Sequence, residues 1–345
     1  MKKTKITIIL ILILVTTGCR SAIVEFLINK GINNYNQMKT YEGTILEKGV
    51  LDNEDIISIV KYKKPDLIMT KTISPESLKD DCFAYDGKNI YIFNAQLKLG
   101  ILISGINDVI PDSHDTIQAR LKQNALRIAN EYDVSYKGRR QLAGRSTHYY
   151  HLMCHHKHNR YAPKEKVWND VEFAMPLKVI MNTTNDELFY SFEFKTITFN
   201  PPMDIKEFQY RFPPGTIVAK WNLGGKNYSL TEIKHLMNFP VQSPHFLPSS
   251  MKRIKIVKAE GPIPAACFIF SDGMYHILLS EIKSFGLMID KQKGISIPSI
   301  KHHAKLNFFG EEIVVSWIKD NVQLMLSSNL PYDQVIGIAE NISED

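Results

Sequence analysis

The chain of 345 residues contains only four cysteines, and no two of them form a Cys-x-x-Cys pair. It also lacks a Gly-x-Ser-x-Gly turn, a phosphate-binding loop, a dinucleotide-binding glycine motif and a His-Glu-x-x-His pair. These patterns are the usual sequence signatures of serine hydrolases, nucleotide-binding enzymes and zinc proteases. Their absence argues against these enzyme classes. We therefore predict a protein without catalytic residues, cofactor or metal.

A strong excess of charge of one sign is missing as well. The sequence has 42 Lys+Arg and 36 Asp+Glu, a formal net charge of +6. Without the three lysines of the first five residues the balance is 39 − 36 = +3. A nucleic-acid-binding protein requires a concentrated basic face. We therefore expect no nucleic-acid partner.

Long apolar runs are absent except at the N-terminus, MKKTKITIILILILVTTGC. Its lysines precede an apolar run over residues 6–15, which is too short to span a bilayer as a helix. This order is typical of a secretory signal, and Cys19 directly after Gly18 resembles the bacterial lipobox, in which the cysteine is acylated. We predict a lipoprotein signal peptide over residues 1–18 and lipidation at Cys19. An uncleaved N-terminal anchor is the alternative. Either arrangement places the rest of the chain in the cell envelope, on the periplasmic or outer face of a bacterial membrane.

Short apolar runs separated by turn residues predict a β-rich protein. Helices are expected at residues 21–38, after residues 111–113, near 230–237 and at 332–341. Strands are expected at residues 44–46, 56–62, 67–73, 82–85, 90–93, 99–103, 134–136, 148–153, 166–168, 177–181, 188–199, 253–257, 267–270, 275–281, 313–317 and 322–326. The order of these elements predicts an antiparallel sheet with a crossing helix, followed by a smaller α+β module.

Two groups of metal-binding or thiol residues leave alternatives open. A disulfide between Cys82 and Cys154 is conceivable because both lie in the first half of the chain, although spacing cannot establish it. A cluster of imidazoles and one thiol has the chemistry of a zinc or copper site; it comprises His148, His151, Cys154, His155, His156 and His158. Since alternate residues of a strand point to opposite faces, we expect a polar hairpin end rather than a metal centre.

Aromatic residues are concentrated in the predicted strands and could line a concave sheet face. This arrangement allows two interpretations, a packed core or a partly open apolar cavity for acyl chains or a hydrophobic peptide. The candidate ligand-binding residues are Phe83, Tyr85, Tyr91, Phe93, Phe192 and Phe194. Residues 252–258 alternate basic and apolar side chains, which is ordinary half-buried strand patterning. A basic strand face meeting anionic lipid headgroups is the alternative for this segment.

Several short motifs in a fixed order resemble a known fold. They are Tyr-Glu-Gly-Thr at residues 41–44, Tyr-Asp-Gly-Lys at 85–88, Leu-Ala-Gly-Arg at 142–145 and Phe-Pro-Pro-Gly at 212–215. Their succession resembles the LolA/LolB-type lipoprotein carriers, and the first motif resembles the N-terminal domain of the periplasmic sigma-E regulators of the MucB/RseB type. Residues 245–248, 270–274 and 330–332 resemble the second domain of that family.

The resemblance implies an α+β protein, with a LolA-like incomplete antiparallel β-barrel capped by helices and a smaller α+β C-terminal domain. It places the first domain at residues 19–215, a linker at 216–243 and the second domain at 244–345. Members of the family bind lipids or lipidated ligands, and the sigma-E regulators hold an anti-sigma factor. The resemblance thus implies a non-enzymatic, lipid-anchored envelope protein that binds a lipid, a lipoprotein or a membrane-protein segment. Binding of the periplasmic segment of an anti-sigma factor is the alternative function.

Overall fold

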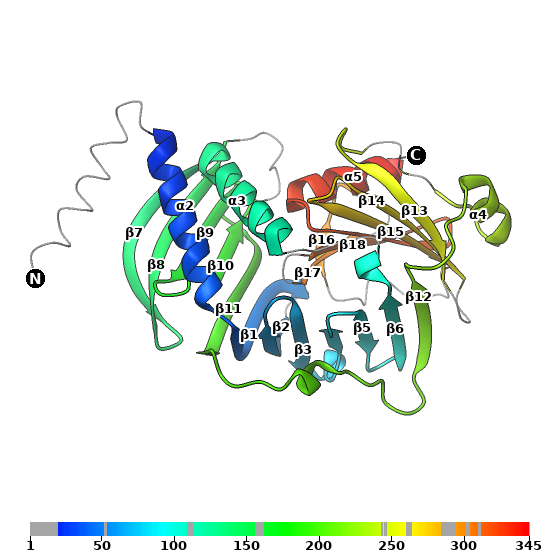
Figure 1. Cartoon of the computed structure of the whole chain (residues 1–345), viewed down its shortest axis with the longest axis horizontal. Helices are drawn as coiled ribbons and strands as arrows, with labels where there is room; N and C mark the ends of the chain where they lie inside the picture. Colours follow the sequence, from blue (N-terminus) through cyan, green and yellow to red (C-terminus); the bar gives the residue numbers. More distant parts are fainter. Residues whose placement is uncertain are drawn as a thin grey trace, which may run out of the picture.

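The computed structural model describes residues 20–51, 54–108, 114–155, 162–242, 244, 247–259, 264–283, 294–300, 304–309 and 312–344 (Figure 1). The predicted signal and Cys19 lie outside these residues. None of the helices described is both long enough and apolar enough to cross a membrane.

The first sheet has 12 strands in the order β12-β6-β5-β4-β3-β2-β1-β11-β10-β9-β8-β7. Its strands are β1 (Thr40–Leu51), β2 (Glu54–Lys63), β3 (Leu67–Ser74), β4 (Cys82–Tyr85), β5 (Asn89–Asn94), β6 (Leu99–Ser104), β7 (Tyr132–Leu142), β8 (Arg145–Cys154), β9 (Lys164–Asp170), β10 (Pro176–Asn182), β11 (Leu188–Phe199) and β12 (Ile217–Asn222). Neighbouring strands are antiparallel except β12, which pairs with β6 in parallel. The two edge strands, β12 and β7, do not pair with each other, so the sheet is an incomplete barrel, as predicted.

Two helices cover one face of this sheet at the β7–β11 end (Figure 1). They are α2 (Arg20–Gln37) and α3 (His114–Glu131). At the end of α2, Met38 is fully buried in a cluster that also contains Val60 of β2 and Phe194 of β11. We call the face that carries these side chains the inner face and the opposite one the outer face. Because side chains alternate along a strand, the register assigns each strand residue to one of them.

The segment between β11 and β12 passes along the outer face. Its short 3-10 helix η4 (Ile205–Phe208) places Glu207 within 2.5 Å of Lys61 on β2. Further along, Tyr210 and Phe212 pack against the outer side of β5. The segment ends in β12, which lies in the first sheet although the predicted linker begins at residue 216. We therefore propose that the first domain extends to Asn222.

The second sheet has seven strands in the order β13-β14-β15-β19-β18-β17-β16. They are β13 (Lys252–Lys258), β14 (Ala265–Ser271), β15 (His276–Lys283), β16 (Ile295–Ile297), β17 (Ala304–Phe309), β18 (Glu312–Lys319) and β19 (Val322–Ser328). Helix α5 (Tyr332–Glu344) packs on this sheet over the fully buried Trp317. Helix α4 (Leu230–Leu236) precedes the first strand of this sheet in the chain. The sequence reading missed β16 and β17.

The two sheets share buried side chains. Trp221 and Leu223, at the end of β12, pack with Val257 and Ile269 of the second sheet. A second contact lies beside α3, where the Tyr275 hydroxyl donates to Asn124 Oδ1 at 3.1 Å. The second sheet therefore packs against the inner face at the β12 end of the first sheet and contacts helix α3 at the other end.

The disulfide considered from the sequence does not form, and Cys82 and Cys154 are both free. Cys82 lies on β4 and Cys154 on β8, and six strands separate these two in the sheet. At about 4.8 Å per strand this separation far exceeds the roughly 7 Å within which two cysteine Cα atoms can be bridged.

Candidate functional site

Four of the six predicted ligand-binding residues lie on the inner face. Phe83 and Tyr85 are there because they pair with Thr70 and Ile68 of β3, which belong to the same face as Val60. Phe192 and Phe194 are there because they pair with Glu47 and Ile45 of β1. The structure thus brings these four side chains to one side of the sheet, in two groups separated by β1, β2 and β3.

Tyr91 and Phe93 lie on the outer face instead. They pair with Ala84 and Cys82, the residues of β4 that alternate with Phe83 and Tyr85. Phe93 is 6 % exposed in a cluster closed by Tyr210 and Phe212. The prediction that all six aromatic residues share one cavity is therefore wrong for this pair, because adjacent strands in register place residues 83 and 93 on opposite sides.

The two inner-face phenylalanines of β11 differ in exposure. Phe194 is 2 % exposed and meets Tyr41 edge-on at 5.9 Å, so it belongs to the packed core. Phe192 is half-buried and lies 6.4 Å from Phe194. A ligand on the inner face would contact only the exposed part of Phe192, which packs against two buried clusters, and would have to displace the core to reach Phe194.

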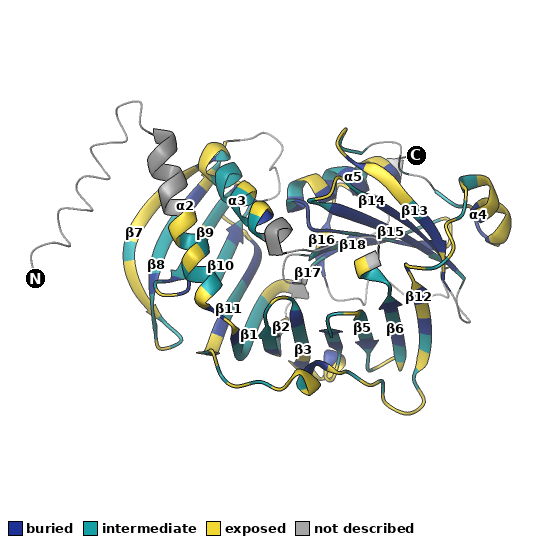
Figure 2. Cartoon of the chain, viewed as in Figure 1, coloured by how far each residue is buried: buried dark blue, intermediate teal, exposed yellow. Residues whose placement is uncertain are grey.

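A half-exposed apolar surface of the inner face lies at the β7 edge, where sequence reasoning placed no site residue. Val134 and Tyr136 are 50 % and 51 % exposed. Val134 pairs with the buried Leu152 of β8 and Tyr136 with the half-buried Tyr150, whose ring lies 5.5 Å from the Tyr136 ring. The alternation Tyr132, Val134, Tyr136 is the sequence signal that predicts one apolar face here. Figure 2 shows β7 as mostly exposed.

One imidazole borders this apolar edge. His148 Nδ1 lies 3.4 Å from the Tyr136 hydroxyl. Burial lowers the pKa of His148, and the cations Arg139 and Lys30 lower it further. Because Lys30 belongs to α2, this interaction also shows that α2 passes close to β8. Burial likewise raises the pKa of Tyr150.

A buried carboxyl group lies between the inner face, α3 and the second sheet. Burial raises the pKa of Glu165 on β9 to about 7, the negative Asp333 of α5 acts in the same direction, and Arg127 of α3 opposes it. The Tyr132 hydroxyl donates to Glu165 Oε1 at 3.3 Å. This end of the inner face is therefore closed by polar contacts rather than open to a ligand.

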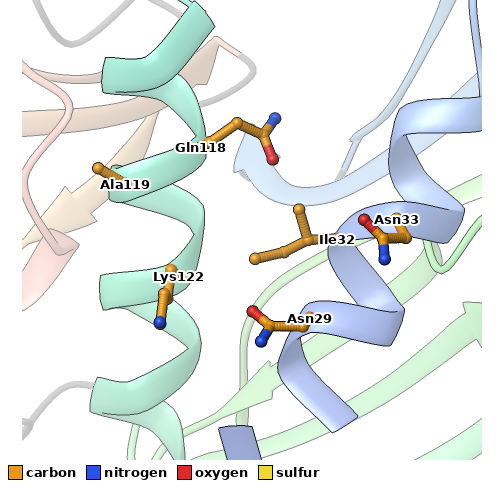
Figure 3. Close-up of a pocket in the computed structure, with 6 residues that line it drawn as sticks. All are labelled: Asn29, Ile32, Asn33, Gln118, Ala119 and Lys122. Carbon is orange, nitrogen blue, oxygen red and sulfur yellow. The ribbon is translucent and has the colours of Figure 1, made fainter. Parts of the chain in front are cut away.

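The two covering helices are joined at one end and leave a hollow between them farther along. Asn36 of α2 and Gln118 of α3 exchange side-chain hydrogen bonds of 3.0 and 3.1 Å. Beyond this pair the hollow has a volume of about 470 Å³ (Figure 3). It is lined by Asn29, Ile32, Asn33, Gln118, Ala119 and Lys122. Its lining is mixed, with Ile32 and Ala119 as the apolar members.

The histidine and cysteine cluster is divided between surfaces. His148 lies on the inner face of β8 and His151 on the outer face, while His155 Nε2 lies 3.2 Å from Asp133 Oδ1. His156 and His158 lie outside the described residues. Among the residues that the structure describes, no three His, Cys, Asp or Glu side chains gather as a metal site.

Comparison with known proteins identifies a matching family for part of the chain. The sequence model of the MucB/RseB N-terminal domain matches residues 100–212. This match confirms the resemblance to the MucB/RseB-type family that the sequence motifs indicate. A search of curated proteins finds no match.

Solved structures show distant similarity. MucB is 13 % identical, with 92 % of this chain and 96 % of that chain covered and a TM-score of 0.48. The MucA/MucB complex of Pseudomonas aeruginosa is also 13 % identical over 91 % of this chain and 97 % of that chain, with a TM-score of 0.44. The Mycobacterium tuberculosis lipoprotein LppX is 12 % identical, with 53 % and 98 % covered and a TM-score of 0.35.

Proposed function

We propose that this chain, which carries a MucB/RseB-type N-terminal domain, is a non-enzymatic, lipid-anchored envelope protein that binds an amphipathic ligand on the inner face of its first sheet. The observation that carries the proposal is the half-exposed apolar edge of that face, formed by Val134 and Tyr136 of β7 and Tyr150 of β8. No covalent chemistry is needed, because burial of an acyl chain contributes about 0.8 kcal/mol per CH₂ group.

The position of the polar groups suits a ligand with a charged head and an apolar chain. Lys30 and Arg139 lie close enough to His148, beside the β7 edge, to interact with it electrostatically. An acidic headgroup would meet these cations while its chain follows the inner face toward Phe192. The ligand class is therefore an anionic lipid or the acylated end of a lipoprotein.

The experiment is direct uptake by the delipidated protein. We expect saturable binding of a fluorescent fatty acid and of a diacylated lipopeptide, and no binding of the same peptide without acyl chains. Failure to take up either acylated probe would contradict the proposal.

The second candidate is a regulator that holds the periplasmic segment of an anti-sigma factor. The match of residues 100–212 to the MucB/RseB N-terminal domain favours it, and one solved structure shows MucB with the periplasmic part of MucA. A sigma/anti-sigma gene pair beside the gene for this chain would supply the segment to test. If the protein binds that segment saturably but does not bind the acylated probes, this second function becomes the preferred one.

A further inference from the structure

A row of stacked cations and rings crosses the outer face of the first sheet at the β7–β10 end. Tyr149 of β8 and Trp168 of β9 are direct cross-strand partners, and their rings are stacked at 4.4 Å with an angle of 18°. Lys178 of β10 is the partner of Trp168, and its Nζ lies 5.3 Å from the indole ring. On the other side, the guanidinium of Arg140 on β7 lies 5.6 Å from the Tyr149 ring.

This order decides which ligands the row can contact. Tyr149 and Trp168 cover one ring face of each other, and the cations Arg140 and Lys178 lie over the two remaining faces. Cation–π contacts of this kind fix the rings upright on the sheet. A sugar, which stacks on an open ring face, finds none here. The ring edges and the cationic heads remain for contact, which is how tryptophan and tyrosine sit among lipid headgroups.

Further cations surround the row. Lys137, Arg140 and Lys166 are exposed. His151, which lies beside Tyr149 on the outer face, has a pKa lowered by burial and then by Lys137 and Lys166, so these two lysines lie near it. The acidic partner in the row is Glu193, which bonds both Lys178 and Lys195. The surface around the two rings is therefore predominantly positive.

The chain enters the described structure at the same end of the sheet. Helix α2 begins at Arg20, and its Lys30 interacts with His148 on the inner face of β8. Ten residues of helix extend over about 15 Å. A lipid anchor just before Arg20 would thus hold the strands β7, β8 and β9 near the membrane.

We propose that this outer surface, formed by Lys137, Arg140, Tyr149, Lys166 and Trp168, docks on the anionic headgroups of the bilayer. The inference rests on the proposed membrane anchoring, and it adds an orientation: the outer face of β7–β9 lies on the membrane. Lysine and arginine near an anionic surface, together with interfacial rings, are the recognised chemistry of such docking.

Bromolipid quenching of tryptophan fluorescence tests the docking on the full chain as purified. The sequence has three tryptophans, and Trp221 and Trp317 are 5 % and 0 % exposed. We expect quenching in vesicles of brominated phosphatidylglycerol, little in brominated phosphatidylcholine, and loss of the quenched component in Trp168→Phe. High salt should reverse the quenching because it screens exposed charges.

Charge reversal provides the matched comparison. The triple variant Lys137→Glu, Arg140→Glu and Lys166→Glu should weaken docking about 100-fold or more and abolish most of the quenching. The control reverses three exposed cations of the basic strand β13, Lys252, Arg253 and Lys258, and should quench like wild type. Equal quenching in both lipids, no quenching in either, or loss in the β13 control alone would overturn the proposal. Fatty-acid uptake by the triple variant of the outer face should stay as in wild type. A failure of the docking proposal can therefore be told apart from a failure of the proposed function.

Discussion

Phe83 and Phe93 occupy neighbouring strands of the first sheet and point to opposite faces. Phe83 pairs with Ile92, whereas Phe93 pairs with Cys82. One ring therefore faces the inner side on which we propose ligand binding, and the other is sealed under Tyr210 and Phe212. Substitution of these two residues should therefore have different costs in stability.

We expect Phe93→Ala to cost about 3–5 kcal/mol of unfolding free energy, because it opens a cavity in a closed aromatic cluster. Its affinity for a fluorescent fatty acid should stay at the wild-type value. Phe83→Ala, at a half-buried position, should cost less stability. Urea unfolding of both variants and fatty-acid titration of Phe93→Ala measure this; equal losses of stability in the two variants would contradict the placement of Phe93 in a closed cluster and of Phe83 on the more open face.

Gly100 on the outer face of β6 is required by close packing. A Cβ atom added to it would lie 2.6 Å from Cε1 of the Phe212 ring. Gly100→Ala should therefore destabilise the protein by about 1–3 kcal/mol through overpacking. The control is Gly337→Ala in α5, where nothing lies within 4 Å of the added atom, and which should stabilise slightly because alanine is the better helix former. Thermal unfolding of both variants decides the matter.

Asp170 holds the turn between β9 and β10. It accepts from Arg145 Nε and Nη2 at 2.8 and 3.0 Å and from the backbone N–H of Phe173 at 2.9 Å. Asp170 is 2 % exposed, so Asp170→Ala should cost about 1–3 kcal/mol, because the backbone N–H of Phe173 and the Arg145 guanidinium lose a buried acceptor. Glu172 also pairs with Arg145, but its side chain is 63 % exposed. Glu172→Ala should therefore lower the free energy of unfolding by less than about 1 kcal/mol. Similar losses at both positions would contradict this ranking.

The raised pKa of Glu165 should make the stability of the protein depend on pH. Its folded pKa of about 7 lies above the ordinary 4.5, so the folded state retains a proton that the unfolded state releases. The stabilisation of the folded state by protonated Glu165 is complete below pH 4.5 and is lost as the pH rises to about 7. Above that range the ionised Glu165 should lower the free energy of unfolding by on the order of 3 kcal/mol.

The variant Glu165→Gln should remove this loss and flatten the stability profile between pH 5 and about 7.5. Glu281, whose pKa burial raises to about 8, contributes a loss of the same sign that remains in this variant. The exposed Glu187→Gln is the control and should reproduce the wild-type profile. Urea midpoints measured across the range test the expectation; an unchanged slope in Glu165→Gln would exclude Glu165 as its source.

The sequence was sufficient for most strands because their apolar runs end at clear turn residues. β4 and β11 have the bounds that the patterns predict. The same patterns could not show that Tyr91 and Phe93 lie on the outer face, because that depends on the register between β4 and β5. Nor could they place β12 in the first sheet, since its partner β6 lies more than 100 residues earlier. The β7 edge was missed because Val134 and Tyr136 read as an ordinary short strand.

The central claim is that the amphipathic ligand binds on the inner face of the first sheet. It is tested most directly by titrating a fluorescent fatty acid into two matched variants, Tyr136→Asp on the inner face and Ile59→Asp on the outer face, at residues that are 51 % and 41 % exposed. The account predicts that Tyr136→Asp loses most of the affinity because it places an acid beside the acyl chain, while Ile59→Asp binds like wild type. Equal affinity in both variants, or loss only in Ile59→Asp, would contradict it.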